Sequence, residues 1–96
     1  MTILLMYDIE TGCTGGARRL QKMAKLCEAY GTRVQRSVFQ MTLDLRMLDS
    51  LRDRIRSLIN PEKDRVMIYP LSESAAERAE CIGSGKVIHR NETLIL

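Results

Sequence analysis

The spacing of apolar residues changes along the first third of the chain, and each spacing predicts a different element. Residues 3–7 are an unbroken apolar run, typical of a strand buried on both faces, so we expect a strand from Thr2 to Asp8. From Ala17 to Tyr30 the apolar residues recur every three or four positions. This period predicts an amphipathic helix, with Thr14 as a candidate N-cap and Gly31 as its end.

The middle of the chain predicts further strands and a second helix. The segment from Arg33 to Met41 is β-branched and aromatic, but its alternation changes parity, so we expect a bulge or bend near Arg36 and Ser37. A second apolar stripe of helical spacing begins after Asp44, a candidate N-cap, and ends at Asn60-Pro61. Up to this point, the order of the predicted elements is that of a split βαβ motif.

The last third is predicted to add one clear strand, from Arg65 to Leu71, and a short polar helix from Ser74 to Ile82. Two brief extended segments, Lys86–Ile88 and Glu92–Leu96, would follow. We therefore predict an α+β fold, a ferredoxin-like βαββαβ sandwich with an extra C-terminal strand, in one domain covering residues 1–96. The tail, residues 80–96, ends on three apolar residues and is expected to contact a partner or a second copy.

Composition narrows the class of protein. At 96 residues and 45% hydrophobic content, one small core is expected, and dimerisation would add to its marginal stability. Three cysteines without a CxxC pair indicate neither a disulfide framework nor a zinc site. The apolar stretches are too short to span a bilayer and the chain opens directly into a strand, so we expect a cytoplasmic protein without a membrane partner.

Positive charge is concentrated in one part of the chain. The formal net charge is +3, yet residues 17–36 carry six basic residues against one acid, a net +5. A clustered positive patch suits a polyanion such as a nucleic acid, because each neutralised phosphate releases counterions. The alternative is a merely solvated helix face. The segment after Pro70 is acidic instead, through Glu73, Glu77 and Glu80, and is expected to meet a different partner.

Asp8 is the best candidate for chemistry, because it ends an apolar strand and a glycine-bearing loop follows it. A carboxylate on a rigid strand end can bind a hard metal ion with little reorganisation. The alternative is that Asp8 accepts hydrogen bonds from loop amides or merely ends the strand. No histidine lies close in sequence to act as a base.

Several segments, in their order and spacing, resemble the CRISPR-associated Cas2 family. They are Tyr7-Asp8, Gly15-Gly16 before Arg18-Arg19-Leu20, residues 30–39, residues 61–64 and residues 68–71. The resemblance covers most of the chain, and its ending looks most like the form found in type I-C systems. One departure is Gln40, where the family often has an acid.

The resemblance implies a twofold homodimer in which the two copies of Asp8 face each other and hold Mg²⁺, with Asp8 as both metal ligand and catalytic residue for phosphodiester hydrolysis of DNA or single-stranded RNA. It also implies a bridging role in spacer acquisition, in which the dimer binds duplex DNA and joins dimers of the CRISPR integrase subunit. Tyr7 and Phe39 match family positions near the site, although core packing is their simpler interpretation. The residues we would assign to phosphate contacts are Arg18, Arg19, Lys22, Arg33 and Arg36.

Two functions of other classes stay open at this point. One is a ribonuclease toxin of the same fold, and the other is an RNA-binding domain unrelated to spacer acquisition. The chain has only four aromatic residues, and none are paired as on an RNA-binding sheet, which argues against the second.

Overall fold

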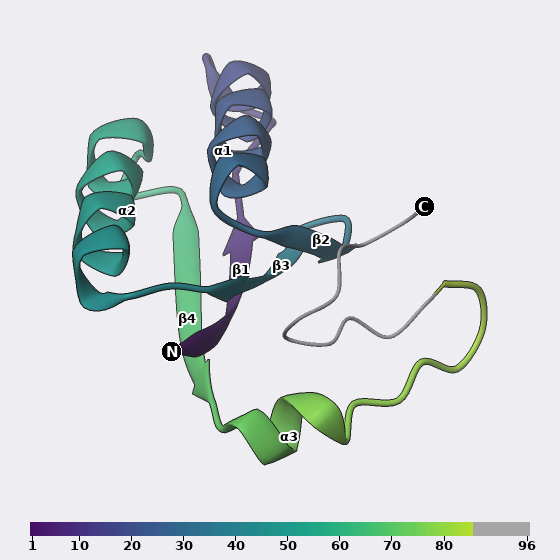
Figure 1. The fold of residues 1–96 in the computed structure, drawn as a ribbon. Coiled ribbons are helices and arrows are strands. Elements are labelled where there is room, and N and C mark those ends of the chain that lie inside the picture. The colour runs from purple at the N-terminus through teal and green to yellow at the C-terminus, as the bar shows by residue number, and fades with distance from the viewer. Residues whose placement is uncertain (86–96) are drawn as a thin grey trace.

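The computed structural model describes residues 1–85, and its core is one four-stranded sheet (Figure 1). The strands are β1 (Thr2–Asp8), β2 (Thr32–Gln35), β3 (Val38–Thr42) and β4 (Arg65–Leu71), and their order across the sheet is β2-β3-β1-β4. Every neighbouring pair is antiparallel. This is the ferredoxin-like arrangement that the order of elements predicts. The predicted C-terminal strand and the segments beyond residue 85 lie outside the described residues.

Two long helices cover one face of the sheet, α1 (Gly16–Tyr30) and α2 (Leu45–Leu58) (Figure 1). Alternate residues of β1 and β3 point to them, and Ile3, Leu5 and Phe39 are fully buried against the apolar stripes of both helices. We call this the helix face. A short third helix, α3 (Glu73–Glu77), follows β4 and ends earlier than the sequence predicts. Among residues 1–85, no helix is long and apolar enough to cross a membrane.

Neither of the two long helices covers the opposite side of the sheet, and we call it the open face. Leu4, Met6 and Asp8 point there, since their neighbours in β1 are buried on the helix face. Across the ladder lie Met67, opposite Met6, and Tyr69, opposite Leu4, which are 42% and 45% exposed. A sheet face with exposed large apolar side chains is a candidate contact surface.

The ends of the helices agree only in part with the sequence-based prediction. Asp44 caps α2 as predicted, and its carboxylate accepts a hydrogen bond of 2.8 Å from the Met47 amide. The prediction for Thr14 was wrong, because the N-cap of α1 is Gly15, with φ at 83°, a conformation that favours glycine. Gly16 is required for close approach, since a Cβ there would overlap the carbonyl oxygen of Glu10.

The segment from Arg33 to Met41 forms a hairpin rather than one bent strand. The turn falls at Arg36 and Ser37, where the change of parity predicted a bend, and the β2–β3 register also shifts between Arg33 and Gln35. Gly31 ends α1 as predicted, but its backbone is extended. A side chain at this position would overlap that of Met41, so close packing rather than a left-handed backbone explains the glycine.

Candidate functional site

Asp8 is the last residue of β1 and is exposed on the open face. Among residues 1–85 no hydrogen bond or ion pair reaches its carboxylate, so the alternative that it binds loop amides has no support in the described chain. Its register partner in β4 is the exposed Arg65. Asp8 therefore offers an unpaired carboxylate on a rigid strand end, which suits a ligand from outside the chain.

A different aspartate, Asp64, binds the loop that follows β1. Its carboxylate accepts hydrogen bonds from the backbone amides of Glu10, at 3.0 Å, and Asn60, at 2.8 Å. It also forms an ion pair with Arg19, whose Nε lies 2.7 Å away, and the Asp64 side chain is fully buried. The Arg19 hydrogen bond is the main cause that lowers the pKa of Asp64 to about 2. This network ties the β1–α1 loop to the segment before β4.

Arg19 is thus placed differently from the other basic residues assigned to phosphate. Its guanidinium donates to Asp64 through both Nε and a terminal nitrogen, and only 16% of its side chain is exposed. An arginine held in this way supports the loop, and less of its charge is available to a polyanion. Sequence reasoning missed Asp64 as its partner, because 45 residues separate the two.

Tyr7 and Phe39 lie on the helix face, on the other side of the sheet from Asp8. Their rings are stacked, with centroids 6.2 Å apart, and both residues are buried. Burial raises the pKa of Tyr7, whose hydroxyl lies 3.4 Å from the Arg36 carbonyl oxygen and donates to it. This geometry favours the packing interpretation of both aromatic residues.

Arg33 and Arg36 lie in the β2–β3 hairpin, away from the N-terminus of α1. The Arg33 guanidinium stands 5.2 Å from the centre of the Phe39 ring and 3.7 Å from a carboxylate oxygen of Glu28. Both contacts leave Arg33 about half exposed, at 43% of its side chain. Arg36 is exposed in the turn itself. The structure therefore does not bring the five predicted phosphate contacts together.

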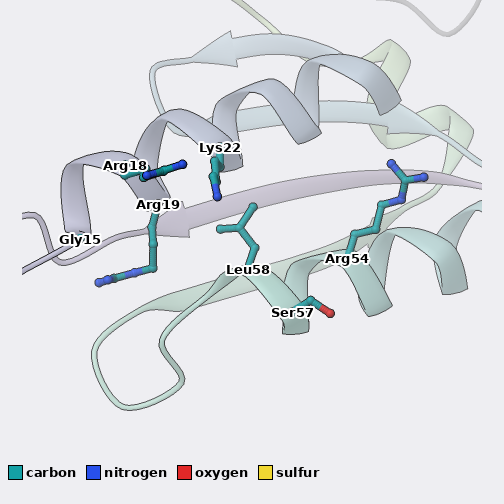
Figure 2. A pocket seen from close by; sticks show the side chains of 7 residues that line it. All are labelled: Gly15, Arg18, Arg19, Lys22, Arg54, Ser57 and Leu58. Atoms are coloured by element: carbon teal, nitrogen blue, oxygen red, sulfur yellow. The ribbon is translucent and has the colours of Figure 1, made fainter.

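Three of the five, Arg18, Arg19 and Lys22, line a groove between α1 and α2 (Figure 2), and of these Arg19 is the one already paired with Asp64. The groove has a volume of about 460 Å³, and α2 contributes Arg54, Ser57 and Leu58 to it. In Figure 2 Lys22 reaches from α1 toward Leu58, and Arg54 rises from α2 farther along the same space. We call this the α1–α2 groove. Because it lies between the helices, it is separated from Asp8 by the sheet.

The donor set around Asp8 fits a magnesium ion only in part. Residues 1–85 contain no group of three or more acidic, histidine or cysteine side chains that could hold a metal. Glu10, two residues on, uses a carboxylate oxygen to accept the Gly12 amide at 2.9 Å. One chain thus supplies one free carboxylate here. Magnesium commonly binds one or two carboxylates together with waters and substrate phosphates, so two copies of Asp8 would match its preference.

A family model described as CRISPR associated protein Cas2 matches residues 1–79. The chain belongs to the Cas2 family. One relative, named CRISPR-associated endonuclease Cas2, from Halalkalibacterium halodurans, is 42% identical over 95 residues, which are 99% of each chain. Another, named CRISPR-associated endoribonuclease Cas2 3, from Rhodospirillum rubrum, is 36% identical and covers 98% of this chain and 99% of its own.

Solved structures of Cas2 proteins share the fold. The crystal structure of Streptococcus pyogenes Cas2 superimposes with a TM-score of 0.78 at 34% sequence identity, and the match covers 86% of this chain and 100% of that one. The resemblance deduced from the sequence segments is thereby confirmed at the level of the family, and it favours a CRISPR function over the unrelated toxin and RNA-binding alternatives. The type I-C subtype stays a prediction.

Proposed function

We propose that this protein is a homodimeric CRISPR adaptation protein that binds duplex DNA through its phosphates and bridges dimers of the integrase subunit. The observation that supports it best is the set of cationic side chains on the helix layer, where Arg18 and Lys22 have no partner among residues 1–85. Contacts to phosphates hold a duplex without reading its bases. This property suits a protein whose DNA varies in sequence.

Pairing through the open face supports the dimeric part of the proposal. That face exposes Met67 and Tyr69, and Asp8 lies on it at the end of the interior strand β1. Twofold packing of this face would bury the apolar side chains and bring two carboxylates to one interface. It would also leave both helix layers outside, so the cationic groove of each copy would stay accessible.

A metal-dependent endonuclease is a second candidate function, favoured by the free carboxylate of Asp8 and by relatives named endonucleases and endoribonucleases. Two Asp8 side chains would hold the ion, and bound magnesium would polarise a phosphodiester and activate water. Asp8 would hold the ion in a fixed position, because it lies at the rigid end of β1. The substrate would be DNA or single-stranded RNA.

The nuclease candidate is tested by Asp8→Asn in the purified protein, with cleavage of labelled duplex DNA and single-stranded RNA followed in Mg²⁺ and in EDTA. We expect the variant to lose most of its activity, since it replaces the proposed metal ligand. Glu10→Gln is the matched control, because its side chain is already bonded to the Gly12 amide, and it should remain active. Full activity of the Asp8 variant would exclude this site as the source of cleavage.

The bridging role is tested by titrating labelled duplex DNA across a range of salt, with and without the integrase subunit. Binding dominated by phosphates predicts a steep fall of affinity with salt, by about 0.9 logarithmic units per decade for each phosphate contacted. A ternary complex that needs both proteins is the expected result with the integrase. A flat salt dependence, or the absence of any ternary complex, would contradict the proposal.

A further inference from the structure

The arginines of α2 differ in how their charge is used. Arg52 is paired with Asp49 at 3.2 Å, and Arg56 is paired with Asp53 at 3.5 Å, both three residues back along the helix. Arg54 lies between them in sequence, but no ion pair involves it among residues 1–85. The reason is local, because the positions three and four before and after Arg54 hold no acid. Its charge is therefore available to a ligand.

Arg54 lines the same groove as the free cations of α1. Arg18 and Lys22 are four residues apart and so share one side of α1, and the space between the helices separates them from Arg54 (Figure 2). Arg19, at the N-terminal end of the groove, is already paired with Asp64. No acidic side chain of the described chain lines the groove, so three unpaired cations surround a space of about 460 Å³.

The α2 side of the groove offers little that competes for these cations. The Ser57 hydroxyl donates to the backbone carbonyl of Asp53 at 3.1 Å, and Leu58 is apolar. The two arginines and the lysine therefore concentrate positive charge around the groove, and a bound anion would reduce their mutual repulsion. A phosphate group fits this arrangement, because its oxygens accept hydrogen bonds from guanidinium and ammonium groups at once.

We propose that the α1–α2 groove is a phosphate-binding subsite for a nucleic-acid backbone, with Arg54 of α2 as a contact in addition to Arg18 and Lys22. This rests on the proposed function, since it assigns to α2 a part in holding the nucleic acid. It also separates the two activities in space: the phosphate is held on the helix layer, and Asp8 lies on the open face of the same sheet.

The test compares single arginine substitutions on one helix. Arg54→Ala is set against Arg52→Ala and Arg56→Ala, which remove the same charge from the same helix but from side chains already paired. Affinity for a labelled duplex of arbitrary sequence is measured by fluorescence anisotropy at several salt concentrations, and circular dichroism melts verify that each variant is folded. Arg54→Lys, which keeps a point charge, is the rescue variant.

We expect Arg54→Ala to weaken duplex binding and to reduce the slope of log affinity against log salt by about 0.9 for each groove engaged. The two control variants should keep the slope of the original protein, and Arg54→Lys should restore most of it. An equal loss in all three alanine variants would overturn the subsite, because it would mean that only overall charge matters. Duplex binding that is absent in the unchanged protein would instead refute the proposed function.

A further arm separates the backbone from a free nucleotide as the source of the phosphate. A mononucleotide and inorganic phosphate are titrated as competitors against the labelled duplex. The proposal expects displacement only at concentrations far above those of competing unlabelled duplex. A mononucleotide that binds tightly, and whose binding alone depends on Arg54, would overturn the assignment to a nucleic-acid backbone.

Discussion

At the scale of single residues, two aspartates with opposite surroundings define this protein. Asp8 is exposed and has no described partner, whereas Asp64 is buried and satisfies two amides and one guanidinium. A carboxylate without partners can receive a ligand, and one that is fully bonded stabilises the chain around it. The loop that follows Asp8 is thus held in place by Asp64.

The Asp64 network predicts an acid-sensitive part of the stability. Its pKa is about 2 in the folded protein and near its ordinary value of 3.8 in the unfolded chain, so the ionised form favours folding. This contribution is present above about pH 4 and is lost as the pH falls through about 2. Denaturant titrations from pH 5 to pH 2 should show the free energy of unfolding falling over that window.

Asp64→Asn should remove this part of the pH dependence and should lower the free energy of unfolding at neutral pH by about 2 to 3 kcal/mol, because buried donors lose their acceptor. Asp49→Asn is a suitable control, since its ion pair with Arg52 is exposed. A pH profile for Asp64→Asn that matches the unchanged protein would mean that another group causes the acid sensitivity.

At the scale of elements, the sequence predicts what is periodic or chemically local. The apolar stripes locate α1 and α2, and Asp44 predicts the start of α2, because one side chain and one nearby amide determine that cap. The change of parity between Arg33 and Met41 also indicates the bend at Arg36 and Ser37. The cap of α1 is missed because Gly15 is selected by backbone conformation and Gly16 by contact with the Glu10 carbonyl, both of which depend on three-dimensional packing.

The same distinction applies to the candidate site. The position of Asp8 at a strand end follows from the apolar run before it, and its exposure agrees with that reasoning. The assignment of Arg19 to phosphate could not anticipate Asp64, which folding brings to it from a distant segment. Arg54, by contrast, could have been found, because the spacing of acids along α2 already pairs its two neighbours and leaves it out.

The N-cap of α2 gives a prediction at this scale. Asp44→Ala should lower the free energy of unfolding by about 1 kcal/mol, because the Met47 amide loses its acceptor. Asp53→Ala, in the same helix, removes only an exposed pair and should change stability by less than about 0.5 kcal/mol. The comparison is made by urea denaturation, and equal losses in both variants would argue against the cap.

At the scale of the whole molecule, the sheet divides the protein into two surfaces of different chemistry. The helix layer carries the α1–α2 groove, and the open face carries exposed apolar side chains beside Asp8. We expect the open face to meet a second copy, because two large exposed side chains, Met67 and Tyr69, lie there on one strand, β4.

Met67→Asp tests that expectation. A charge on the open face, on the edge strand β4, should convert the dimer into monomers, as measured by light scattering after size exclusion, while the melting curve stays cooperative. Met47→Asp is the matched control, since Met47 is also 42% exposed but lies on α2. Retention of the dimer by the Met67 variant would place the interface elsewhere.

The position of Asp8 and the α1–α2 groove on opposite sides of one thin sheet has an evolutionary consequence. Under the proposed functions, a substitution that removes the Asp8 carboxylate would leave the cations of the groove in place, and one that removes a groove cation would leave Asp8 unchanged. Natural selection could then adjust the two proposed properties independently, and descendants that keep only nucleic-acid binding would need no redesign of their scaffold.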